Sequence, residues 1–199
     1  YFVKNTQSFT EQLPYFQIKV GYILVITLFY KLGLSSPMAV LFTSLISYFF
    51  SGLLLFYILK LLFPKKYWLA IGLTVAAMLL PPMTYMSRVS TPDMFIFQFM
   101  LIFIIALIKN WSKWIMFLLL FGITFIRPDY ITFTLTYIIA VFFFYYIREK
   151  KIDVSLIAQG TVLLLMYLAI IKFYHYPGWK DVFYDTFIDR RPIISTHPI

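Results

Sequence analysis

Long apolar runs, each closed by a short polar break, leave this chain few ways to fold. Hydrophobic residues make up 62% of the 199 residues and charged residues only 13%, whereas a soluble domain is about half apolar and about a quarter charged. A soluble core could not absorb that excess. The expected fold class is therefore all-α, a polytopic bundle of transmembrane helices, because a helix satisfies its own backbone polar groups within lipid.

The polar breaks divide the chain into one short helix and about six spans. The apolar run 20–30 is too short for a crossing, which needs roughly 20 residues, and predicts an interfacial or re-entrant helix. Ser35 and Ser36, followed by Pro37, then mark the start of the first span. The six expected spans cover residues 35–62, 67–81, 94–108, 114–126, 130–147 and 154–174.

Three regions follow from this division. Residues 1–34 form an outer-face segment that carries the short interfacial helix, residues 35–174 form the transmembrane core, and residues 175–199 begin an outer-face loop. The chain starts at Tyr1 and shows no signal-peptide pattern. We therefore expect it to be a piece of a longer membrane protein, with further helices at both ends.

The charges in the breaks predict the orientation. Alternate connections are rich in lysine, and the positive-inside rule places them in the cytoplasm. The connections between them carry one arginine each, Arg88 and Arg127, and share the opposite face with residues 1–34 and the tail from His175. We expect a multi-pass protein of the bacterial inner membrane whose working face is outward. The lysine-rich set is Lys65, Lys66, Lys109, Lys113, Arg148, Lys150 and Lys151.

The net charge of +9 does not predict nucleic-acid binding, because membrane proteins collect lysine and arginine in their cytoplasmic loops. The expected partners are membrane lipids. The chain has no cysteine and only two histidines, which excludes thiolate chemistry and a histidine cluster. Nothing resembles a glycine-rich phosphate loop, a zinc spacing or a Ser-His-Asp order. We expect no metal and no cofactor.

Two similar polar segments, Thr91-Pro92-Asp93 and Arg127-Pro128-Asp129, open the third and fifth expected spans. Proline suits the first helical position, and an aspartate beside it complements the positive end of the helix dipole. The plainer interpretation of Asp93 and Asp129 is therefore that they start helices. The alternative is that they belong to a substrate-binding site on the outer face.

The two arginines are harder to explain as helix starts, since a cation at a helix N-terminus is mildly unfavourable. Arg88 and Arg127 either snorkel to headgroups or pair with a nearby aspartate, or they bind phosphate through their forked guanidinium groups beside free helix N-termini. Lys19 is a further candidate for substrate binding, and its plainer role is interfacial anchoring. Glu11 is a candidate catalytic base, although such a residue is more often simply solvated.

Three stretches of the chain have a distinctive layout. Residues 14–19 are followed by a short apolar helix, then by residues 32–35 and a long span. Farther on, one span leads through Pro-Pro and Tyr-x-x-Arg-x-x-Thr-Pro-Asp into the next span, and Arg127-Pro128 forms a polar break before a later helix. This layout, over most of the chain, resembles that of the GT-C-type integral membrane glycosyltransferases, a superfamily that includes the protein O-mannosyltransferases and the aminoarabinose transferases of lipid A.

The resemblance implies an enzyme that transfers a sugar from a polyprenyl-phosphate donor to an acceptor at the outer face. The catalytic acid of that superfamily lies in the first outer loop, which places it upstream of residue 1 here. Glu11 is the only acid before the first apolar run, and it has no acidic neighbour. Arg88 and Arg127 would stabilise the departing lipid phosphate.

Two alternatives stay open. An O-antigen polymerase or ligase also handles undecaprenyl-linked sugars with outer-face arginines. A transporter or flippase of lipid-linked saccharides should show polar residues at midspan and paired broken helices. The midspans here are nearly free of polar residues, the exceptions being Ser44, Ser47, Ser51 and Gln98.

Overall fold

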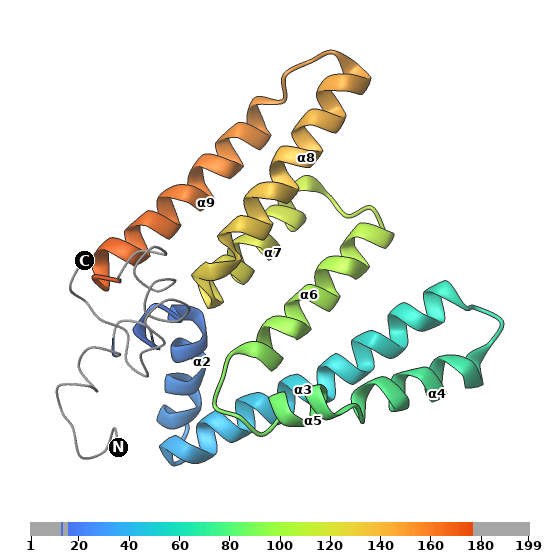
Figure 1. The fold of residues 1–199 in the computed structure, drawn as a ribbon, viewed down its shortest axis with the longest axis vertical. Coiled ribbons are helices and arrows are strands. Elements are labelled where there is room, and N and C mark those ends of the chain that lie inside the picture. The colour runs from blue at the N-terminus through green and yellow to red at the C-terminus, as the bar shows by residue number, and fades with distance from the viewer. Residues whose placement is uncertain (1–12, 14–15, 177–199) are drawn as a thin grey trace, which may run out of the picture.

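A computed structural model describes residue 13 and residues 16–176, and the regular elements in that part of the chain are all helical (Figure 1). The expected all-α class is therefore confirmed there. In chain order the elements are α2 (Val20–Lys31), α3 (Ser36–Leu62), α4 (Tyr67–Met78), α5 (Pro81–Met86), α6 (Asp93–Ile108), α7 (Lys113–Ile126), the 3-10 turn η2 (Pro128–Tyr130), α8 (Ile131–Glu149) and α9 (Val154–Phe173).

Within the described part of the chain, three helical segments are long and apolar enough to cross a membrane: Ser36–Leu62, Pro128–Glu149 and Val154–Phe173. The chain is an integral membrane protein. The helices α2, α4, α6 and α7 are equally apolar but shorter, with α4 only 12 residues long. At 1.5 Å per residue α4 rises about 18 Å, against a hydrocarbon thickness of about 30 Å. Crossing by α4, α6 and α7, and hence the count of six spans, stays a prediction.

The expected second span, 67–81, is divided in the structure. Helix α4 ends at Met78, Leu79 and Leu80 form a break, and α5 begins at Pro81. Pro81 occupies the first helical position, where the missing proline N–H costs nothing. The Pro-Pro pair therefore starts a new short helix instead of closing a span.

A stripe of small residues on α3 packs inside the bundle. Ala39, Thr43, Ser47 and Ser51 are spaced four apart and are almost completely buried. Small side chains on one face allow close approach between helices in a membrane. The Thr43 hydroxyl donates to the Ala39 carbonyl at 2.8 Å and the Ser47 hydroxyl to the Thr43 carbonyl at 2.7 Å. Local hydrogen bonds thus account for the hydroxyls of Thr43 and Ser47, whereas the buried Ser51 hydroxyl has no hydrogen-bond partner among the described residues.

Further along α3, Ile58 packs against Leu101 and Ile105 of α6, which makes α3 and α6 a closely packed pair. Helix α4 lies at the edge of the molecule and packs chiefly on α3 (Figure 1). The second half of the chain forms its own core, in which Leu120, Ile123 and Leu163 are buried.

The connections α3–α4, α6–α7 and α8–α9 lie at one end of the bundle, and the start of α2 lies with the ends of α7 and α9 at the other (Figure 1). We name the first the lysine-rich end, after the lysines of its three connections, and the second the arginine end, after Arg88 and Arg127. The alternation expected from the charges is thus present in the arrangement of the helices.

The absence of cysteine allows a direct test of this topology. Ser90 and Lys65 are exposed at opposite ends. In whole cells, Ser90→Cys should react with a membrane-impermeant maleimide, and Lys65→Cys should react only after permeabilisation. Lys151→Cys, exposed at the lysine-rich end, serves as the control and should behave like Lys65→Cys. Equal labelling of Ser90→Cys and Lys65→Cys in intact cells contradicts the topology.

An ion pair joins two connections at the lysine-rich end. Lys113, at the start of α7, donates to Asp153, which precedes α9. The Asp153 carboxylate also accepts from the Ser155 N–H at 3.1 Å and from the Ser155 hydroxyl at 2.7 Å. The Lys113 hydrogen bond, followed by that of Ser155, lowers the pKa of Asp153 from 3.8 to about 2.

A lowered carboxylate pKa stabilises the fold above the unfolded-state value, and this contribution is lost as the pH falls through the folded-state value. Wild-type protein should therefore lose thermal stability between about pH 3.8 and pH 2 through this group. Asp153→Asn should start with a lower melting temperature and lose less over the same interval. Melting curves in detergent against pH test this, and parallel curves for the two proteins count against it.

Candidate functional site

A cluster of charged side chains lies at the arginine end, with Arg127 at its centre. The Arg127 Nη1 donates to Asp93 Oδ1, and its Nε donates to Asp129 Oδ2 at 3.2 Å. All three side chains are partly buried, with Asp93 the most exposed at 33%. The guanidinium carbon lies 6.0 Å from the centre of the Tyr130 ring.

The local sequence explains how Arg127 reaches both carboxylates. Proline disfavours the helical conformation in the residue before it, and Arg127 before Pro128 is extended, with φ −146° and ψ 102°. Helix α7 therefore ends at Ile126, and the chain re-enters helix through η2. Asp93 is the first residue of α6. The ion pairs thus connect the end of α7 to the beginning of α6.

Lys19 is the second cation of the cluster. It precedes α2, and only 8% of it is exposed, although lysine is rarely buried without compensation. Burial, and next the positive charge of Arg127, lower the pKa of Lys19, while Asp129 and Asp93 act in the opposite direction. Together Lys19, Arg127, Asp93 and Asp129 carry no net formal charge.

A close helix contact holds Lys19 beside this cluster. A Cβ atom placed on Gly21 would lie 2.9 Å from Ile126 Cγ1 and 3.0 Å from Ile126 Cα. No other residue type fits there without moving α2. The neighbouring Tyr22 packs with Ile126 and with Ile96 of α6. Three segments far apart in sequence therefore meet at the site.

The structure brings together four of the predicted site residues: Lys19, Asp93, Arg127 and Asp129. Arg88 lies in the α5–α6 connection, is exposed, and forms no ion pair with any described residue. Glu11 lies outside the described residues. Sequence reasoning missed Gly21, although a glycine two residues after a charged side chain and within an apolar run was the available signal.

The arrangement differs from an open arginine fork. Asp93 and Asp129 already engage the Arg127 guanidinium, so an incoming phosphate must compete with a carboxylate. What the cluster offers is two cations and two carboxylates within one partly enclosed region. Across residue 13 and residues 16–176, no group of three or more His, Asp or Glu side chains is arranged to hold a metal ion.

Comparisons with protein-family models, with curated proteins and with solved structures give no match to this chain.

The close contact at Gly21 predicts that any larger side chain at this position destabilises the fold. Gly21→Ala should reduce the free energy of unfolding by about 1–3 kcal/mol, because the added methyl group overpacks the contact with the Ile126 backbone. Gly72→Ala is the matched control, since nothing lies within 4 Å of a Cβ at Gly72 in α4. That change should be neutral or stabilise by up to about 1 kcal/mol through helix propensity. Thermal unfolding in detergent compares them, and equal effects exclude the contact as the cause.

Proposed function

We propose that this chain belongs to a membrane glycosyltransferase of the GT-C type, which transfers a sugar from a polyprenyl-phosphate donor at the outer face of the bacterial inner membrane. The supporting observation is the gathering of Lys19, Asp93, Arg127 and Asp129 at one end of an apolar bundle. Charge near membrane depth is costly, and where it occurs it tends to mark function.

The chemistry of lipid-linked sugar transfer needs both kinds of charge. The departing lipid phosphate gains negative charge, which preformed cations stabilise. An acceptor hydroxyl is activated when a carboxylate within hydrogen-bond reach takes its proton. In this proposal Arg127 and Lys19 stabilise the phosphate. Asp93, the most exposed member of the ion pairs, is released from Arg127 when the phosphate takes its place.

The lipid-linked donor also suits the position of the cluster. The site lies at the end of helices whose outer surfaces are strongly apolar, such as α2 with Leu24 and Leu28 about half exposed. A polyprenyl chain can lie along such a surface while its phosphate reaches the cluster. An O-antigen polymerase or ligase uses the same kind of substrate, and identification of the product separates it from the glycosyltransferase.

A transporter is less well supported by the packing. The Ser47 hydroxyl, which sequence reasoning singled out at midspan, bonds to its own helix within a buried stripe. Gln98 is half-buried on α6. Neither residue joins a polar path from one end of the bundle to the other among the described residues.

Arg127 provides the decisive test in the full-length protein. Arg127→Ala should lower transfer from a polyprenyl-phosphate sugar by about a hundredfold per folded molecule, because one preorganised charge stabiliser is lost. Arg127→Lys should retain part of the activity, since it keeps the charge and loses the fork. Arg148→Ala, in the exposed last turn of α8, is the matched control and should leave turnover unchanged.

A purely structural role for Arg127 gives a different pattern. In that case Arg127→Ala and Asp93→Asn would lower the melting temperature together, and activity would fall only in proportion to the folded fraction. Full turnover per folded molecule of Arg127→Ala would remove the phosphate role.

A further inference from the structure

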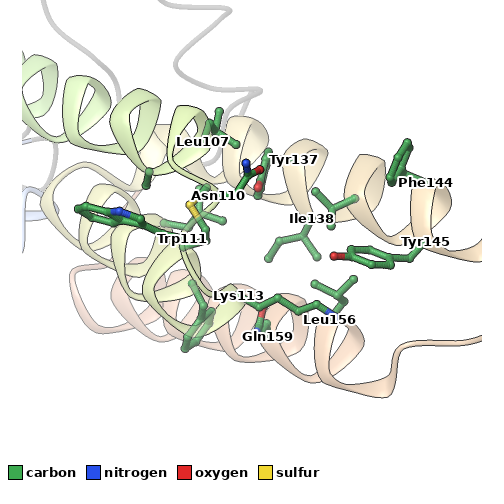
Figure 2. A pocket seen from close by; sticks show the side chains of 15 residues that line it. Leu107, Asn110, Trp111, Lys113, Tyr137, Ile138, Phe144, Tyr145, Leu156 and Gln159 are labelled. Atoms are coloured by element: carbon green, nitrogen blue, oxygen red, sulfur yellow. The ribbon is translucent and has the colours of Figure 1, made fainter. Parts of the chain in front are cut away.

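A cavity of about 290 Å³ opens between α6, α7, α8 and α9 near the lysine-rich end, away from the charged cluster. Its volume is close to the lower limit for small-ligand pockets. Most of its wall is apolar or aromatic. Figure 2 shows Asn110 and Tyr137 on one side of the cavity and Lys113 and Gln159 on the other.

Gln159 is the unusual member of this wall. It is only 4% exposed, and its side-chain nitrogen has no hydrogen-bond partner among the described residues. A buried polar group without a partner costs about 1–3 kcal/mol, and such groups in native proteins call for an explanation. A buried amide without a partner in the wall of this cavity is explained if the cavity accepts a hydrogen-bonding ligand.

The charge of the wall restricts that ligand. Among the described residues that line the cavity, Lys113 is the only charged one, and none is a carboxylate. Its Nζ lies 4.3 Å from the centre of the Tyr145 ring and pairs with Asp153, which is not part of the wall. A lysine, an amide and tyrosine hydroxyls supply hydrogen-bond donors, so the cavity favours an anion with several acceptor oxygens.

A second, apolar hollow adjoins the cavity. It has a volume of about 470 Å³, lies between α8 and α9, and shares Ile138 and Leu156 with the cavity. Its wall is almost wholly aliphatic and aromatic, with Thr161 the exception. A donor-lined cavity next to an apolar groove matches an amphipathic ligand. Basic pockets between helices on the lysine-rich side of a membrane bind the headgroups of anionic lipids.

We propose that this cavity binds the phosphate of an anionic phospholipid, with Lys113 and Gln159 as donors and the acyl chains in the groove between α8 and α9. The site is separate from the charged cluster at the arginine end. It does not depend on the proposed transfer reaction, and it gives the lysine-rich end a specific lipid contact in addition to its general attraction for an anionic leaflet.

Thermal unfolding in detergent, with added phosphatidylglycerol, phosphatidylcholine or inorganic phosphate, tests the proposal. Phosphatidylglycerol should raise the melting temperature of the wild-type protein saturably, and phosphatidylcholine should not. Gln159→Leu should weaken the apparent affinity by about tenfold, as expected for the loss of one hydrogen bond to a charged group. Gln98→Leu, the same change on a half-buried α6 residue outside the cavity, should leave the affinity unchanged.

Two surface variants keep the proposal testable if Gln159→Leu does not fold. Lys113→Gln and Asp153→Asn both remove the ion pair, but only the first removes the cation from the cavity wall. Lys113→Gln should weaken phosphatidylglycerol binding about tenfold, and Asp153→Asn should preserve or strengthen it. Equal losses in the two variants overturn the site. Equal stabilisation by phosphatidylglycerol and phosphatidylcholine also contradicts the proposed site. If inorganic phosphate alone raises the melting temperature by the same amount, the ligand is free phosphate and not a lipid.

Discussion

The ion pair between Arg127 and Asp93 is the contact on which the arginine end depends. It joins the residue that follows α7 to the first residue of α6, and Asp129 holds the same guanidinium from the following turn. In a partly buried place, removal of one partner leaves a charge without compensation, which costs more than the pair itself contributes. Helix packing and charge pairing therefore depend on each other here, because the end of α7 and the start of α6 can pack together only when Arg127 pairs with Asp93.

Much of the helical layout follows from local chemistry. Ser35, two residues before Pro37, precedes the start of α3. Helices α3 and α8 end near the basic residues that were expected to end them. The predicted end of the second span was wrong, because a separate helix begins at Pro81 and α4 is only 12 residues long. Periodicity was of little help, since helices that face lipid on one side and protein on the other are apolar all round.

The site was only partly predictable. Sequence reasoning named Asp93 and Arg127 and offered pairing with a nearby aspartate as one alternative, but the pairing across 34 positions depends on how α6 meets α7. Arg88 carried the same sequence signal as Arg127 and lies exposed, apart from the cluster. The difference arises because Pro128 directs the backbone at Arg127, whereas Arg88 lies in an open connection. Lys19 looked like an anchor for the interface, whereas it is buried, two residues before the close contact between Gly21 and Ile126.

The position of α4 has a consequence for how the molecule opens. This helix packs chiefly on α3 and lies at the edge of the bundle (Figure 1), whereas α7 contacts α2, α6, α8 and α9. Segments with few buried neighbours open locally at a lower free energy than the rest of a protein. The amide hydrogens of α4 should thus exchange with solvent deuterium ahead of those of α3, α6 and α7, because α4 can leave the edge of the bundle while the α3–α6 pair stays packed.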